Sequence, residues 1–249
     1  MKFDPTQPVK QIVAQAPGSA RVFEMKGIDY CCGGEKPLGE ACRQAGVTVE
    51  DVLLALQTAE MSPTGPADEN PDWSRAPLAS IIEHIVANHH QYCRREQNRI
   101  AMLLAKVADV HGARHPELFR IQSVFLKMSK DLTLHLTKEE TTLFPLIQEM
   151  ERAAMEKKAA PKPLFGTIQA PISMMILEHD GSGAELKELR GLSNGYALPG
   201  DACSTYHSLY EALQAFEQDM HRHVYLENYV LFPRTVELEK HLDAFAARA

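Results

Sequence analysis

An eleven-residue pattern occurs twice in this chain and limits its fold more than any other feature. The copies run from His135 to Pro145 and from His223 to Pro233. In both, a glutamate follows the histidine by four residues, and Leu-Phe-Pro comes at the same later offset. Residues four apart lie on one face of an α-helix, so each copy directs an imidazole and a carboxylate the same way. This is the spacing of metal ligands on a helix.

Two further histidines extend the pattern into a longer repeat. His179 precedes His223 by 44 residues, and His90 precedes His135 by 45. The region from about residue 77 to 245 therefore divides into two similar halves, each with two long helical patterns. This predicts an all-α fold containing a four-helix bundle. The ligands predicted for its core are His90, His135, Glu139, His179, His223 and Glu227.

The surroundings of these residues favour metal binding over two ordinary alternatives. A single histidine on an apolar helix face is usually a hydrogen-bonded core residue, and a His–Glu pair can be a solvated surface contact. Apolar neighbours such as Ile172 and Phe216 instead predict imidazoles that face the core, with Glu139 and Glu227 beside them. An unpaired buried carboxylate costs roughly several kcal/mol, and a bound metal removes that cost.

Four imidazoles and two carboxylates suit two metal ions, each bound by two histidines and bridged by both glutamates. Mixed nitrogen and oxygen donors with vacant positions favour iron or manganese by function, although copper and zinc bind such donors more tightly. Open positions would admit O2, NO or water, which indicates a reactive centre. His89 adjoins His90, and spacing alone does not separate the two.

Three acidic residues are candidates to support the ligands. Asp131 and Asp219 each precede a predicted ligand histidine by four residues, and Glu178 adjoins His179. They are placed either to orient the imidazoles and carry protons or to lie exposed on the helices.

Charge and composition exclude several classes of partner. The 249 residues include 26 Lys plus Arg and 33 Asp plus Glu, a net charge of −7, without a basic run that could follow a phosphate backbone. Neither an apolar N-terminal segment nor a stretch of about 20 apolar residues occurs. We therefore expect a cytoplasmic protein that binds neither nucleic acid nor membrane. Its five cysteines fit reduced thiols better than structural disulfides.

The order of patterns predicts two parts joined by a linker. Residues 1–61 read as a small helical domain, in which Thr48 and Asp51 resemble a capping box. Residues 62–76 are rich in proline and predict an extended tether, and residues 77–249 form the bundle. Pro145 and Pro233 are expected to kink or break their helices. The four long helical segments are predicted at residues 77–110, 116–156, 171–191 and 201–245.

The chain resembles a known family in both of these parts. The two repeats, with His90 and His179, resemble the hemerythrin-like HHE cation-binding bundle. The N-terminal stretch resembles the short domain fused to that bundle in the RIC (repair of iron centres) di-iron proteins, and it contains Asp29, Tyr30, Cys31, Cys32, Gly33, Gly34, Leu38, Ala41 and Cys42. The resemblance implies a non-haem centre of two iron ions, with the four histidines as terminal ligands and Glu139 and Glu227 as bridges. It selects His90 over His89.

The same resemblance implies channel-lining acids at Asp131 and Glu178. An aspartate stands at position 131 where the family leads us to expect a glutamate. The adjacent thiols of Cys31 and Cys32 could bind iron, trap NO or relay electrons, or could be two buried small side chains at a helix end. Gly33 and Gly34 allow close backbone approach beside the sulfurs.

By this resemblance, the protein repairs iron–sulfur clusters damaged by NO or oxidants. It would act by NO reduction or scavenging, by iron donation, or by both. Its expected partners are NO or O2 and damaged iron–sulfur proteins, and a homodimer is compatible with the sequence. A non-catalytic O2 or NO sensor and an iron-storage module are the alternatives, so the sequence leaves open whether the protein is a nitric oxide reductase.

Overall fold

The computed structural model describes residues 3–16, 18–61, 73–158 and 166–246, and its chain divides into two compact units. The N-terminal unit comprises Met1–Pro77 with His221–Phe232, and the bundle unit comprises Leu78–Met220 with Pro233–Ala249. The described residues form helices and no strand, with one isolated bridge between Pro8 and Pro37. The all-α prediction is confirmed. Most of the predicted linker, residues 62–72, lies outside the described residues.

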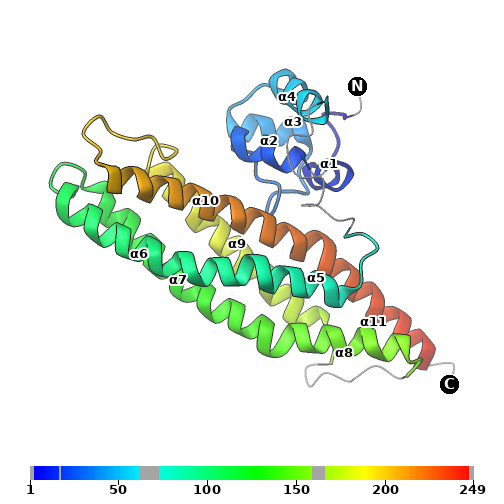
Figure 1. Cartoon of the computed structure of the whole chain (residues 1–249). Coiled ribbons are helices and arrows are strands. Elements are labelled where there is room, and N and C mark those ends of the chain that lie inside the picture. The colour runs from blue at the N-terminus through cyan, green and yellow to red at the C-terminus, as the bar shows by residue number, and fades with distance from the viewer. Residues whose placement is uncertain (1–2, 17, 62–72, 159–165, 247–249) are drawn as a thin grey trace. The chain divides into compact units, whose positions relative to one another are not determined.

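Four helical runs follow one another after the linker (Figure 1). The first two runs are α5 (Leu78–His84), η1 (Ile85–His90) and α6 (Gln91–His111), then α7 (Glu117–Lys138), η2 (Glu139–Leu143) and α8 (Phe144–Met155). The last two are α9 (Gln169–Leu192), then α10 (Ser204–Leu226), η3 (Glu227–Leu231) and α11 (Phe232–Ala246). These bounds lie within a few residues of the predicted segments. Both parts expected from the sequence are present: a helical bundle and a small helical N-terminal region.

Aromatic and aliphatic side chains hold the helices of the bundle unit together. Helix α7 packs against both α6 and α9. The ring of Phe216 on α10 lies edge-on to Phe125 of α7, with centroids 5.8 Å apart, and stacks on Tyr92 of α6 at 6.5 Å. Arg190 of α9 donates three hydrogen bonds to buried Glu217 of α10, so this carboxylate is neutralised in the core. The polar contact therefore accompanies the apolar packing without an uncompensated charge.

The two prolines of the repeat follow wider turns, and the helices do not break. Pro145 and Pro233 come just after the π-helical turns η2 and η3, and the backbone stays right-handed helical through Phe144 and Phe232. A proline lacks an amide hydrogen, and its ring clashes with the carbonyl four residues earlier. Hydrogen bonds that span five residues displace that carbonyl, which relieves the clash. Of the expected kink or break, the break does not occur, and a π turn that begins at the predicted glutamate precedes each proline.

Four short helices make up the first part of the N-terminal unit. They are α1 (Val9–Gln15), α2 (Ser19–Lys26), α3 (Leu38–Ala45) and α4 (Val49–Met61). The backbone N–H of Asp51 donates to the Thr48 hydroxyl over 3.2 Å, which confirms the predicted cap of α4. Their shared core is apolar and includes Ile12, Phe23, Leu38, Val52 and Leu56.

The helical segment 221–232 completes this unit through a buried ion pair. The Arg222 guanidinium donates to both carboxylate oxygens of Glu24, over 2.9 and 2.8 Å, and the Tyr30 hydroxyl donates to the same carboxylate. The Tyr30 ring also contacts the rings of His221 and Tyr225. A carboxylate as buried as Glu24 needs such a bidentate partner, so Arg222 fixes this segment against α2.

No helix in the described part of the chain combines the length and apolar character that a membrane crossing requires.

Candidate metal centre

Six buried side chains form two overlapping groups of potential metal ligands. In each group, the available nitrogen and oxygen atoms lie within 4.8 Å of one another. Glu139 and Glu227 belong to both groups. One group adds His90 and His223, and the other adds His135 and His179. The structure therefore brings together all six residues that the repeat predicts as ligands.

Three of the six candidates lie at the ends of π turns. His90 is the last residue of η1, while Glu139 and Glu227 are the first residues of η2 and η3. His179 lies inside α9, which is α-helical throughout. A π turn contains one residue more than an α turn and so rotates the side chains that follow it. His90, at the end of η1, thus owes its direction to a feature that the 3.6-residue period does not include, whereas Glu139 and Glu227 stand before the added residue and keep α-helical spacing from His135 and His223.

The Glu139 carboxylate shows that a cation fits this group. Both of its oxygens are buried and accept no hydrogen bond within the described ranges, 3–16, 18–61, 73–158 and 166–246. Its nearest polar neighbours are Nε2 of His90 at 3.5 Å and Nε2 of His135 at 3.4 Å. A buried carboxylate without a hydrogen-bond donor is strongly disfavoured, whereas a metal ion would satisfy both oxygens. The buried histidines and glutamates are therefore compatible with a metal centre.

Two outer carboxylates set the orientation of the first-half histidines. Nδ1–H of His90 donates to Glu140 over 2.6 Å, and Nδ1–H of His135 donates to Glu178 over 2.9 Å. A proton held on Nδ1 leaves the lone pair of Nε2 available to bind a cation within the two ligand groups. Nε2 of His135 lies 3.0 Å from Nε2 of His179, an approach that a shared cation would stabilise. Carboxylate partners of this kind are typical of histidines that bind metals.

The same two carboxylates are themselves held ionised. Burial raises the pKa of Glu178, but hydrogen bonds from Lys138 and His135 outweigh it, and the pKa lies below its usual value. Burial likewise raises the pKa of Glu140, and Arg94 and His90 together bring it below its usual value. Each carboxylate is thus stabilised as an anion beside a histidine.

The remaining predicted outer residues lie elsewhere. Asp131 is exposed and pairs with Lys127 on its own helix, so the structure does not bring it to a ligand histidine. Asp219 accepts a hydrogen bond from Nδ1 of His89 over 2.9 Å, which accounts for that buried histidine outside the two groups. Glu178 does contact a candidate ligand, but that residue is His135 and not its neighbour in the chain.

Glu140 is a candidate functional residue that the sequence analysis did not identify. Its only signal in the sequence is its position directly after Glu139, which on an α-helix points about 100° away. The carboxylate reaches His90 of the first helical run and is anchored by Arg94, one turn further along that run. A contact between two helical runs cannot be read from the spacing within one of them.

A third group of potential ligands lies in the N-terminal unit and contains Asp29, Cys31 and Cys32. The two sulfurs are 3.6 Å apart, and both cysteines are free thiols. Oδ1 of Asp29 accepts the backbone N–H groups of Cys32 and Gly33, which forms the turn. The hydrogen bond with Cys32, burial and the charge of Asp29 all raise the pKa of the Cys31 thiol.

The segment that carries Glu227 also holds this thiol turn. Asn228, the next residue, donates its side-chain amide to the carbonyl oxygen of Cys31 over 3.4 Å. A Cβ on Gly34 would lie 3.0 Å from the ring of Tyr229 and 2.4 Å from the carbonyl oxygen of Tyr30. Only glycine therefore allows the turn to approach the helix this closely.

A helical bundle with two overlapping histidine and carboxylate groups defines a cation-binding protein of the hemerythrin type. Residues 81–235 match the family model described as the hemerythrin HHE cation binding domain. Residues 5–60 match a second model, ScdA_N, described as a domain of unknown function.

Three relatives match nearly the whole chain. A protein of Haemophilus influenzae named probable iron-sulfur cluster repair protein is 30% identical over 92% of this chain and 96% of its own length. A protein of Pectobacterium atrosepticum named iron-sulfur cluster repair protein YtfE is 29% identical over 94% of this chain and 98% of its own length. A protein of the same name from Citrobacter koseri is 32% identical over 92% of this chain and 96% of its own length. With its match to the hemerythrin HHE model over residues 81–235, the chain belongs to the hemerythrin HHE family, as the sequence resemblance implied.

Proposed function

We propose that this protein binds two iron ions and repairs iron–sulfur clusters damaged by NO or oxidants. The observation that carries the proposal is the pair of overlapping groups that share Glu139 and Glu227. A carboxylate common to two groups is suited to bridge two metals, and two imidazoles then remain for each metal. The repair role rests on the names of the relatives, which match both parts of the chain.

In this proposal, His90, His135, His179 and His223 are terminal ligands and the two glutamates are bridges. Bound iron would supply redox chemistry and coordination positions for a small molecule such as NO or O2. The chain's own part is to exclude water, since all six side chains are buried. Glu140 and Glu178 hold protons on Nδ1 of His90 and His135, which keeps the opposite nitrogens available as donors.

The thiol turn is proposed to exchange iron or electrons with damaged clusters. Two sulfurs 3.6 Å apart beside a carboxylate offer soft donors for iron, and the hydrogen bond from Asn228 links the turn to the residue after Glu227. We further propose that residues 1–61 form the domain that meets damaged iron–sulfur proteins in the cytoplasm, with residues 62–76 as its tether to the di-iron bundle at 77–249.

Replacing the shared carboxylates tests the centre. The double variant Glu139→Gln/Glu227→Gln should fail to retain two irons per chain, because a neutral amide cannot balance the cations or bridge them. Anaerobic reconstitution followed by metal analysis and Mössbauer spectroscopy measures the loss. The matched control is Glu149→Gln/Glu211→Gln, which changes two exposed glutamates of the same bundle. A double variant that keeps two coupled irons would contradict the bridging role.

The fate of NO distinguishes an enzyme from a gas sensor and from an iron-storage protein. Reduced, iron-loaded protein mixed with NO should release N2O and restore an NO-damaged iron–sulfur enzyme, and Cys31→Ser/Cys32→Ser should slow the restoration without removing the bundle iron. A stoichiometric NO adduct that reverses, without N2O or repair, would favour the sensor. Iron uptake and release without any reaction with NO would favour storage.

A further inference from the structure

Cys203 lies at the start of α10, in a setting that is separate from the residues of the metal centre. Its carbonyl oxygen accepts the first hydrogen bond of the helix, from the N–H of His207 over 3.0 Å, so Cys203 is the N-cap. Cysteine is an uncommon cap, since serine, threonine, aspartate and asparagine are preferred there. The side chain is exposed, in contrast to the buried Cys31, Cys42 and Cys93.

A buried histidine faces the sulfur. Nε2 of His111 lies 3.3 Å from Sγ of Cys203, while the His111 side chain is only 3% exposed. Its other nitrogen, Nδ1, is buried and has no hydrogen-bond partner in the described part of the chain. The imidazole is therefore directed at the thiol by packing, including ring contact with Tyr206 at 5.3 Å. A cysteine and a histidine within hydrogen-bond reach form a nucleophile–base pair.

The two helix ends favour charge separation in this pair. His111 is the last residue of α6, where partial negative charge stabilises a cation, and Cys203 precedes the first turn of α10, where partial positive charge stabilises an anion. Hydrogen bonds from the backbone N–H of Tyr206 and from His111 lower the pKa of the Cys203 thiol to about 7. A thiolate is the nucleophilic form of cysteine.

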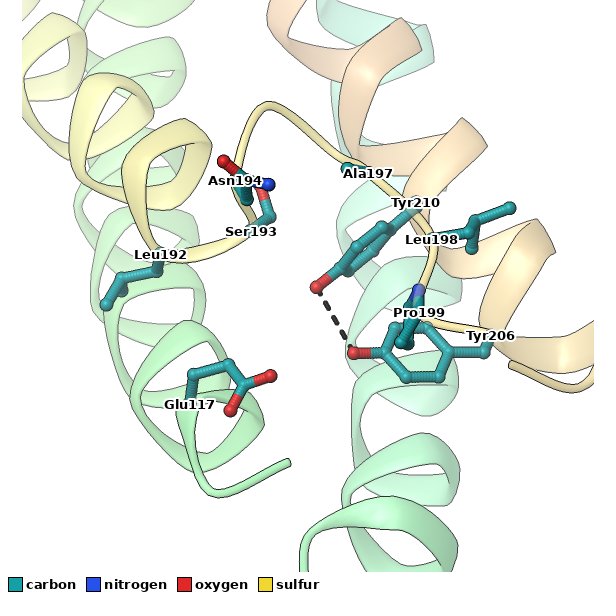
Figure 2. Close-up of a pocket in the computed structure, with 9 residues that line it drawn as sticks. All are labelled: Glu117, Leu192, Ser193, Asn194, Ala197, Leu198, Pro199, Tyr206 and Tyr210. Carbon is teal, nitrogen blue, oxygen red and sulfur yellow. Dashed lines mark hydrogen bonds between the residues drawn. The ribbon is translucent and has the colours of Figure 1, made fainter. Parts of the chain in front are cut away.

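The neighbouring charges are themselves paired with one another. His115 donates hydrogen bonds to Asp201 and Glu117, and Arg114 forms an ion pair with Asp201. Tyr206 contributes to a pocket of about 230 Å³ that is also lined by Glu117 and Tyr210 (Figure 2). The Tyr206 and Tyr210 hydroxyls hydrogen-bond over 3.2 Å, as the dashed line in Figure 2 marks. The N-terminal end of α10 thus carries the thiol at its N-cap and one wall of the pocket in its first turn.

We propose that Cys203 and His111 form a modification site at which small-molecule disulfides react. His111 accepts the proton of the Cys203 thiol, and the thiolate attacks one sulfur of a disulfide RS–SR, so that a bond forms between Sγ of Cys203 and that sulfur while the original S–S bond breaks. The leaving RS⁻ takes the electron pair of that bond and receives a proton from the His111 imidazolium. Cys203 is oxidised to a mixed disulfide, and half of the reagent is reduced to a thiol. This reaction is independent of the proposed cluster repair.

Full-length protein treated with dithiobis(nitrobenzoate), and separately with oxidised glutathione, tests the site. One thiol per chain should react in a fast phase, and peptide mass mapping should place it at Cys203. Its rate should rise with pH around a midpoint near 7, because the thiolate fraction rises there. A fast phase that maps to Cys32 or another cysteine, or a midpoint near that of a free thiol, would overturn the proposal.

A His111→Gln variant then tests the base. The rate at pH 7 should fall by about tenfold and the midpoint should move upward, because the imidazole no longer stabilises the thiolate. His241→Gln, at an exposed histidine of α11, is the matched control and should react like the unaltered chain. Circular dichroism checks that both variants fold. An unchanged rate in a folded His111→Gln variant would refute the pair, and the profile of the unaltered protein stands as a test if that variant does not fold.

Discussion

The first half of the bundle, residues 78–155, and the second half, residues 169–246, place their predicted ligands at matching positions but surround them differently. In the first half, the residue after the shared glutamate is Glu140, which accepts a hydrogen bond from His90. In the second half the matching residue is Asn228, which donates to the carbonyl oxygen of Cys31. One position of the repeat therefore supports a candidate metal ligand in one half and the thiol turn in the other.

The residues before the lone histidines differ in the same manner. Glu178, before His179, accepts from His135 of the other half, whereas His89, before His90, is hydrogen-bonded to Asp219. The inward side chains are alike because they converge on the same two groups. The residues next to them in the chain point to different neighbouring helices, so each one's hydrogen-bond partner depends on the helix that it faces. The duplicated helical pattern thus repeats the candidate ligands but not the residues that hydrogen-bond to them.

The largest effect is expected on iron affinity, when the carboxylates that accept hydrogen bonds from His90 and His135 are removed. Glu140→Gln and Glu178→Gln should each weaken iron binding by about 10- to 100-fold, the usual effect of losing a partner that orients a metal-bound histidine. Competition with a chelator under anaerobic conditions measures the affinity.

Asn228→Ala, at the position that matches Glu140, provides the internal control. Iron affinity should change much less in this variant, while alkylation of Cys31 should become faster because its carbonyl anchor is lost. Equal losses of iron from Asn228→Ala and Glu140→Gln would show that the two halves have equivalent supports.

Crowding the thiol turn should have an intermediate effect on stability. Gly34→Ala places a methyl group 2.4 Å from a backbone oxygen, which cannot move easily, and should lower the free energy of unfolding by about 1–3 kcal/mol. In Gly39→Ala the nearest atom is 3.4 Å away, and the change should stay within about 0.5 kcal/mol. Urea unfolding of metal-free protein compares the two. Equal stabilities would mean that Tyr229 and Tyr30 do not confine the turn.

The smallest effect is expected at Asp131, the first-half equivalent of Asp219. Asp131→Asn should leave iron affinity and thermal stability unaltered, since its side chain is 56% exposed and contacts Lys127. Asp219→Asn should destabilise the fold by about 1–3 kcal/mol because buried His89 loses its carboxylate acceptor. Differential scanning calorimetry of both variants measures their thermal stabilities. Loss of iron from Asp131→Asn would restore the outer-shell role that the sequence suggested for it.

Helical periodicity explains why most of the centre could be predicted. The spacing of His135 with Glu139, and of His223 with Glu227, requires only that residues four apart share a helix face. Helical periodicity also predicted the four helical runs, and the capping-box pattern of Thr48 with Asp51 predicted the start of α4. Helical periodicity did not predict the backbone before Pro145 and Pro233, because each proline follows a π turn, which has more residues per turn than the 3.6-residue period assumes.

Local order along the chain was therefore enough to specify the helices, five of the six inward side chains and the family. It could not choose between His89 and His90, because both are buried and their roles depend on Asp219 and Glu140, which lie 130 and 50 residues away. It could not pair Glu178 with His135, Asn228 with Cys31 or His111 with Cys203 for the same reason. Spacing governs one helix at a time, whereas these contacts arise only when separate helices pack and bring distant side chains within hydrogen-bond range.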